Sequence, residues 1–112
     1  MQILTINLNQ ELAEQLSLHK EYSFCHAQSM ADACHKTAHD EFNFILKKTD
    51  LEFSEDDTVK TLLGLTPIST KILLFGKDVD SQRLCTWREL GIDFIFDPTV
   101  PELIQKIQTN EP

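Results

Sequence analysis

Glycine and cysteine are scarce in this chain of 112 residues, which has three of each and a single tryptophan and tyrosine. The glycines Gly64, Gly76 and Gly91 stand apart from one another, so the sequence has no glycine-rich loop of the kind that cradles phosphate groups. The cysteines are odd in number and lack paired spacing, which argues against a disulfide framework. We therefore expect free thiols and a cytoplasmic protein.

Long apolar runs and an excess of positive charge are also missing. No apolar stretch approaches the roughly 20 residues that cross a bilayer. The first residues carry neither a basic leader nor a small-residue cleavage site, so no signal peptide is expected. Acidic residues outnumber basic residues by 18 to 10, for a net charge of −8. Because nucleic-acid backbones and anionic lipids repel such a charge on average, we expect neither direct nucleic-acid binding nor membrane association.

What remains is the composition of one globular domain that covers residues 1–112, with 41% hydrophobic and 25% charged residues. Short apolar runs alternate with amphipathic segments along the whole chain. The runs predict strands at residues 2–6, 22–27, 42–48, 71–76 and 92–96. The segments that follow them predict helices beginning near residues 10, 30, 55, 81 and 100.

Helix boundaries are indicated by capping residues. Asn9 and Ser29 are expected to cap the first two helices, and Thr99 with Glu102 matches a capping box before the last one. Gly64 and Gly91 are expected to end the third and fourth helices, because glycine readily adopts the left-handed conformation found there. On the fourth helix, the apolar positions expected to face inward are Leu84, Trp87 or Arg88, and Leu90.

Strict alternation of strands and helices predicts an α/β fold, with a parallel sheet covered by helices on both faces. Five strands in a chain of this length fit the flavodoxin-like order 2-1-3-4-5. The second strand is less apolar than the others and is expected at an edge. Residues 7–10, after the first strand, lack the Ser, Thr and Gly content of a loop that holds a flavin phosphate. We expect no cofactor.

One segment carries a resemblance to a known family. Residues 90–98, Leu-Gly-Ile-Asp-Phe-Ile-Phe-Asp-Pro, resemble the Gly-Ala-Asp-x-Tyr-x-x-Lys-Pro segment of bacterial response regulator receiver domains, one residue shorter. Residues 43–46, Asn-Phe-Ile-Leu, resemble the Asp-Leu-Ile-Leu run that leads to the phosphoacceptor, and Ala33-Cys34 resembles an Ala-Leu pair of the second helix. The resemblance covers nearly the whole chain and implies the receiver fold in a two-component or transcriptional-control setting.

The same resemblance implies a set of catalytic residues that this chain lacks. Receivers hold Mg²⁺ with a pair of acids after strand 1 and take the phosphoryl group on an aspartate after strand 3. A hydroxyl residue after strand 4 and a lysine after strand 5 contact the phosphate. The corresponding positions here are occupied by Asn7 and Leu8, by Lys47 or Lys48, by Gly76 and by Asp97. We therefore expect no enzymatic activity and a degenerate, pseudo-receiver domain.

The exchange of a lysine and an acid between two positions suggests a hypothesis about this pocket. Strands 3 and 5 flank strand 4, so Lys47 or Lys48 could pair with Asp97 in reversed polarity. An exposed pair would contribute only about 0–1 kcal/mol, and its role would be to hold the loops in one state. The alternative is that these side chains are simply solvated.

Two aromatic residues suggest an interaction surface. Trp87 stands where receivers usually have a small residue, and Phe94 resembles the aromatic switch residue of the family. Both are candidates for a face formed by the fourth helix, fifth strand and fifth helix, where receivers commonly dimerise or dock partners, since tryptophan is enriched at binding hot spots. Core packing is the alternative for both.

A small ligand-binding, metal-binding or redox protein on the same fold is the competing interpretation. His35 and His39 are four residues apart and share a helix face, as zinc ligands can, but the familiar zinc spacings are absent. Cys25 lies within a strand, where nothing obvious lowers its pKa. We therefore favour a domain that acts by binding a protein partner or a second copy, either alone or as the N-terminal module of a longer regulator.

Overall fold

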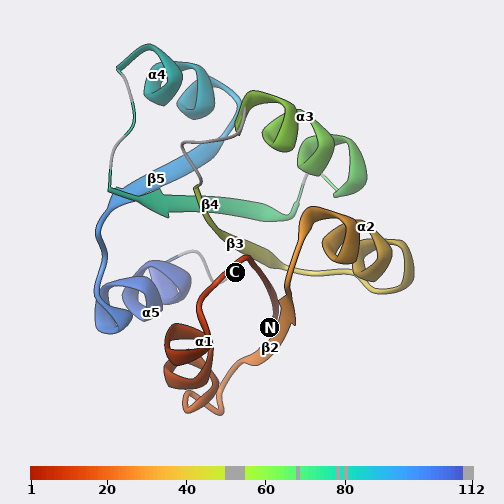
Figure 1. Cartoon of the computed structure of the whole chain (residues 1–112), viewed down its shortest axis with the longest axis vertical. Coiled ribbons are helices and arrows are strands. Elements are labelled where there is room, and N and C mark those ends of the chain that lie inside the picture. The colour runs from red at the N-terminus through yellow and green to blue at the C-terminus, as the bar shows by residue number, and fades with distance from the viewer. Residues whose placement is uncertain (50–54, 68, 78, 80, 110–112) are drawn as a thin grey trace.

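A computed structural model describes residues 1–49, 55–67, 69–77, 79 and 81–109. Strands and helices alternate from end to end, as the hydrophobic pattern predicts (Figure 1). The strands are β1 (Gln2–Ile6), β2 (Ser23–Ala27), β3 (Phe44–Lys48), β4 (Lys71–Gly76) and β5 (Ile92–Phe96). The helices are α1 (Gln10–Ser17), α2 (Met30–His39), α3 (Glu55–Leu65), α4 (Ser81–Glu89) and α5 (Val100–Thr109).

All strands are parallel and lie in the order β2-β1-β3-β4-β5, which confirms the flavodoxin-like prediction. The less apolar β2 lies at one edge and β5 at the other. Helices α1 and α5 cover one face of the sheet, and α2, α3 and α4 cover the opposite face (Figure 1). In the described part of the chain, no helix is both long enough and apolar enough to cross a membrane.

Each face of the sheet has its own apolar core, because side chains alternate between faces along a strand. Ile45 packs on the side of α2, α3 and α4, whereas its neighbours Phe44 and Leu46 pack on the side of α1 and α5. All three are buried, so β3 is the central apolar strand that the sequence indicates. Burial on both faces is typical of a parallel sheet covered by helices.

Capping hydrogen bonds fix the starts of α1, α2 and α5 as predicted. Asn9 Oδ1 accepts from the Leu12 amide at 2.7 Å, and Ser29 Oγ accepts from the Asp32 amide at 3.1 Å. Before α5, the Thr99 amide donates to Glu102 and the Glu102 amide donates to Thr99 Oγ1, which forms the expected reciprocal box.

Two expectations about helix ends are wrong. Gly64 does not end α3 but lies inside its last turn, where Thr66 Oγ1 donates to the Leu62 carbonyl at 2.8 Å and satisfies the helix end instead. Leu90 does not face inward: α4 ends at Glu89, and the Leu90 side chain is 49% exposed. Gly91, with a φ of 83°, follows α4 in the left-handed conformation as expected.

Candidate functional site

The carboxyl ends of the strands form the edge of the sheet where α/β proteins usually place their sites. After β1, the exposed Asn7 has a φ of 61° and its amide donates to the Ala27 carbonyl at 3.0 Å. Leu8 is half-buried and packs against the core beneath α1 and α5. The side chains at these two positions are thus a carboxamide and an apolar group, and neither is a carboxylate.

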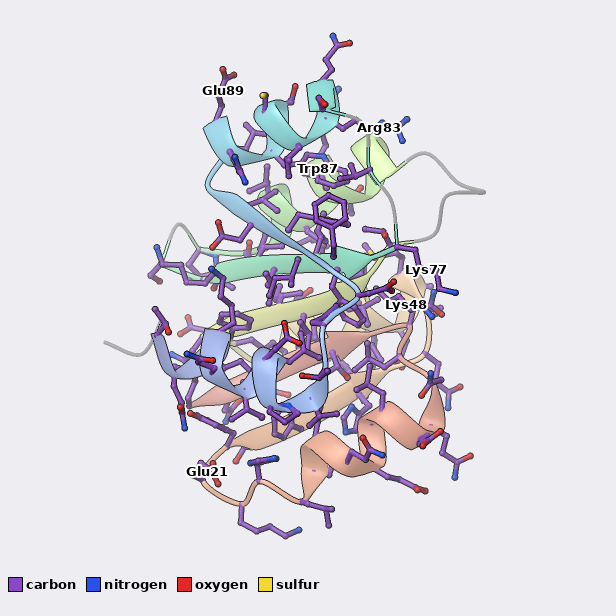
Figure 2. The ribbon with its side chains drawn as sticks, turned by 90° about the vertical axis from the view of Figure 1, so that its left-hand side faces the viewer. Glu21, Lys48, Lys77, Arg83, Trp87 and Glu89 are labelled. Atoms are coloured by element: carbon purple, nitrogen blue, oxygen red, sulfur yellow. The ribbon has the colours of Figure 1, made fainter. Side chains whose placement is uncertain are left out.

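The two lysines at the end of β3 have different environments, because neighbouring side chains point to opposite faces. Lys47 is only 4% exposed, and its Nζ donates to the Lys48 carbonyl at 3.0 Å. Lys48 is exposed at the edge of the sheet (Figure 2). Of the two candidates for the phosphoacceptor position, Lys48 is the one whose amine is open to solvent.

At Gly76 the structure reveals a residue that sequence reasoning missed. The Thr49 amide and hydroxyl both donate to the Phe75 carbonyl, at 2.8 and 3.2 Å. A Cβ added at Gly76 would collide with Thr49 Oγ1. Thr49, from the loop after the neighbouring strand, therefore fills the space that a side chain at position 76 would occupy, and its hydroxyl is used in a hydrogen bond to the backbone. The pairing of Lys48 with Phe75 is the signal that places Thr49 opposite Gly76.

After β5, the backbone of Asp97 continues the sheet, since its amide donates to the Gly76 carbonyl at 2.9 Å. Its side chain is exposed, and the φ of 39° is left-handed. Lys77, which sequence reasoning did not single out, projects at the same edge as Lys48 (Figure 2). The exposed described groups at this edge thus include two amines and a carboxylate.

The hypothesis that Lys47 or Lys48 forms an ion pair with Asp97 is wrong, because neither amine lies within ion-pair distance of that carboxylate. Among the described residues, the ion pairs within 4.0 Å join His19 to Glu21 and Lys36 to Asp32. The Lys47 amine instead turns toward its own strand end.

Mg²⁺ prefers several oxygen ligands, carboxylates above all. Among the described residues that directly follow β1, β3, β4 and β5, Asp97 is the one carboxylate, and no group of three or more metal-binding side chains occurs among the described residues. Lys48 and Lys77 add two amines at the same edge, and an amine that carries a positive charge does not ligate a cation. This donor set does not fit a magnesium ion.

A row of aromatic rings lies between α4 and the end of β5. The Trp87 and Phe94 rings are 5.9 Å apart, and the Phe94 and Phe96 rings are 4.9 Å apart. Trp87 is only 2% exposed, so its predicted place on an interaction surface is wrong and the core-packing alternative is confirmed. Phe94 is partly buried against the same core, whereas Phe96, which sequence reasoning missed, is 52% exposed.

A second polar cluster joins β1, β2 and α1. His26 Nδ1 lies 2.5 Å from Thr5 Oγ1, and its Nε2 lies 2.9 Å from Ser17 Oγ. Because Ser17 Oγ donates to the Ala13 carbonyl, a consistent network has Nε2–H donating to Ser17 and Nδ1 accepting from Thr5. Burial lowers the pKa of His26. The network borders a cavity of about 710 Å³ that Leu8 also lines.

This lowered pKa predicts a pH-dependent stability. The folded state favours neutral His26. The stabilisation that His26 gives to the fold is therefore fully present above the unfolded pKa of about 6.5 and is lost as pH falls below it. We expect the free energy of unfolding to drop by about 1 kcal/mol or less between roughly pH 7.5 and 5.5, the size of one hydrogen bond. Urea unfolding at both pH values measures it. His26→Gln should reduce the drop in the free energy of unfolding between the two pH values, whereas the exposed control His39→Gln should retain it. An equal drop in both variants would contradict the assignment to His26.

The competing metal and redox interpretations gain little from the geometry. The His35 and His39 rings are 4.8 Å apart, so they do share a helix face, but the described residues supply no third ligand beside them. Cys25 and Cys34 are half-buried, and Cys85 is exposed on α4. None of the described thiols lies in a constellation that would activate it.

Comparison with solved structures finds the same fold in response regulators. The chain resembles a two-component response regulator from Clostridium difficile at 16% identity and a TM-score of 0.81, covering 98% of this chain and 94% of that chain. It resembles a chemotaxis response regulator of Vibrio cholerae at 14% identity and a TM-score of 0.78, with 98% of both chains covered. A putative pilus assembly protein of Sinorhizobium meliloti matches at 15% identity and a TM-score of 0.77, covering 99% of this chain and 100% of that chain. No protein-family model and no curated protein matches the sequence.

Proposed function

We propose that this chain is a receiver-like signalling domain that does not accept a phosphoryl group and acts by binding another protein. The fold shared with response regulators supports a role in two-component-type signalling or in the control of a transcription factor. Fold alone does not establish function, and a putative pilus assembly protein shares it. The proposal therefore depends on the residues at the carboxyl edge of the sheet.

The observation that carries the proposal is the replacement of the phosphorylation chemistry at every described position. An amine cannot form the acyl phosphate of receivers, and exposed Lys48 beside Lys77 repels a divalent cation. Thr49 Oγ1 occupies the space that a side chain at position 76 would need, so a hydroxyl residue does not fit there without a shift of Thr49. Asp97 would repel that oxygen where the phosphate-binding lysine of receivers attracts it.

Without phosphorylation, the domain would transmit a signal through a constant surface. We infer that this surface is formed by α4, β5 and α5, hereafter the α4–β5–α5 face, and that it binds a second copy of the chain. The edge strand β5 pairs only with β4 within the described sheet, and the exposed Phe96 ends it. A half-exposed aromatic ring beside a rigid core is a favourable contact residue for a protein partner, because it loses little conformational entropy on binding.

The catalytic part of the proposal is tested with acetyl phosphate and Mg²⁺. We expect the intact mass of the protein to remain unchanged under conditions that phosphorylate a conventional receiver in the same tube, because the described edge offers no acid pair for the metal. Intact-mass spectrometry measures the outcome. An acid-stable, base-labile phosphoryl group mapped to Asp97, to Asp50 or to any other aspartate would refute the proposal.

A further inference from the structure

A cavity of about 710 Å³ lies between α1 and the edge strand β2. Helix α1 packs against β2, which pairs with β1 alone in the described sheet. Because β2 and β5 are opposite edges of the sheet, the cavity lies at the other edge from α4 and β5. Its volume falls within the usual range of small-molecule sites, roughly 300–1,000 Å³.

Helical periodicity builds the α1 wall of the cavity. Four residues of this helix line it: Gln10, Ala13, Glu14 and Ser17. Residues three and four positions apart are neighbours on a helix surface, so these four form one stripe along α1. At a rise of 1.5 Å per residue, the stripe is about 10 Å long and covers most of the helix. Ala13 contributes only a methyl group in its middle, which leaves room for a ligand.

The β2 side of the cavity is a fixed polar wall. His26 is held by Thr5 Oγ1 at Nδ1 and by Ser17 Oγ at Nε2, so both ring nitrogens have partners within the protein. Leu8 and Leu18 add apolar surface, and the side chain of Leu18 is 74% exposed. A ligand would therefore meet a preformed wall whose own hydrogen bonds are satisfied, and its recognition depends on the other polar groups of the lining.

Two opposite charges line the cavity without neutralising each other. Glu14 and Lys20 both belong to the lining and are exposed, and neither takes part in an ion pair with a described residue. The Gln10 side-chain amide donates to Glu14 Oε1 at 3.0 Å, which orients the carboxylate and leaves Oε2 without a described donor. The Lys20 amine carries three N–H donors. A carboxylate and an amine that are kept apart are complementary to a molecule that carries both charges itself.

We infer that the α1–β2 cavity binds a zwitterionic amino acid with an apolar side chain. Glu14 accepts hydrogen bonds from the ammonium group of the ligand, and Lys20 donates to its carboxylate. The apolar side chain of the ligand packs against Leu8, Ala13 and Leu18. Small-molecule sites typically combine such apolar walls with a few placed polar groups. The site is independent of the proposed contact through the α4–β5–α5 face.

The test uses L-phenylalanine as the zwitterionic probe and two analogues that each lack one charge. Phenylalaninamide keeps the ammonium group without the carboxylate, whereas 3-phenylpropanoate keeps the carboxylate without the ammonium group. We expect saturable shifts of the Ala13 and Ala27 amide signals in ¹H–¹⁵N spectra with phenylalanine, and affinities about fivefold weaker for both analogues. Non-saturable shifts, or an analogue that binds as tightly as phenylalanine, would overturn the inference.

Charge-removing substitutions assign the two recognition groups. Glu14→Gln should weaken phenylalanine binding about fivefold without weakening the binding of 3-phenylpropanoate, which has no ammonium group. Lys20→Gln should likewise weaken phenylalanine binding about fivefold without weakening that of phenylalaninamide, which has no carboxylate. Both residues are exposed, and far-UV circular dichroism verifies that the variants fold.

Glu11→Gln is the matched control, because it makes the same charge change on α1 at a residue outside the cavity lining. This variant should bind phenylalanine as the parent protein does. Equal weakening by Glu11→Gln and Glu14→Gln would show a non-specific charge effect and overturn the assignment. So would a Glu14→Gln variant that loses affinity equally for phenylalanine and for 3-phenylpropanoate.

Discussion

Replacing Trp87 by alanine is expected to lower the free energy of unfolding by about 3–5 kcal/mol. The side chain is only 2% exposed, belongs to the core under α2, α3 and α4, and packs against Phe94 at a ring distance of 5.9 Å. Truncation removes this apolar surface and leaves a cavity that the sheet and helices fill only in part. Since domains of this size have a total stability of about 5–15 kcal/mol, the loss is a large fraction of it.

Trp87→Phe is the matched comparison for this prediction. Phenylalanine keeps an aromatic ring in the core and removes the Nε1–H group that has no described partner. Eliminating an unsatisfied buried donor offsets part of the lost packing, so we expect a cost below half that of alanine. Because Trp87 is the only tryptophan, urea unfolding must be followed by far-UV circular dichroism rather than by fluorescence. An alanine variant within about 0.5 kcal/mol of the parent protein would contradict the core assignment.

The fold was predictable because local signals and global architecture agree. Phe44, Ile45 and Leu46 form an unbroken apolar run, which a strand covered on both faces buries completely. The capping box of Thr99 and Glu102 marks the start of α5 directly. Such consistency across levels makes strand order and helix starts readable from one sequence. The prediction that Gly64 ends α3 was wrong because the hydroxyl of Thr66, rather than a left-handed glycine, provides the hydrogen bond at the end of this helix.

The candidate site was predictable only as a set of positions, not as a geometry. Sequence spacing places Lys47 and Lys48 at the end of a strand, but which of them is exposed depends on which face each one occupies. The contact between Thr49 and Gly76 joins residues 27 positions apart and requires the β3–β4 register. Parallel strands bring backbones together, as the Asp97 amide and Gly76 carbonyl demonstrate, without fixing where a side chain points.

Exposed aromatic residues were harder still to foresee. Phe94 and Phe96 alternate with Ile95 along β5, and the pattern alone ranks all three as core. Only the end of the strand and the absence of a described strand beyond β5 leave Phe96 half-exposed. Sequence reasoning therefore singled out the buried Trp87 and the partly buried Phe94 and missed the exposed Phe96. Trp87, the most distinctive residue of that region, supports Phe94 from inside the core rather than meeting a partner.

Replacing Phe96 by serine is expected to convert a dimer into a monomer. If the α4–β5–α5 face binds a second copy, the 52% exposed ring at the end of β5 is its principal apolar anchor. Central aromatic anchors contribute about 2 kcal/mol or more, so the dissociation constant should rise about thirtyfold. Sedimentation velocity over a range of protein concentrations measures the shift, with circular dichroism verifying the fold.

Leu18→Ser provides the matched control, because Leu18 is even more exposed, at 74%, and follows α1, which covers the sheet face opposite α4. This substitution removes an exposed apolar side chain of similar character that belongs to none of α4, β5 and α5, so it should leave the dimer intact. A parent protein that remains monomeric at every concentration would refute self-association. Equal weakening by both substitutions would instead indicate that general surface hydrophobicity, rather than Phe96, holds the two copies together.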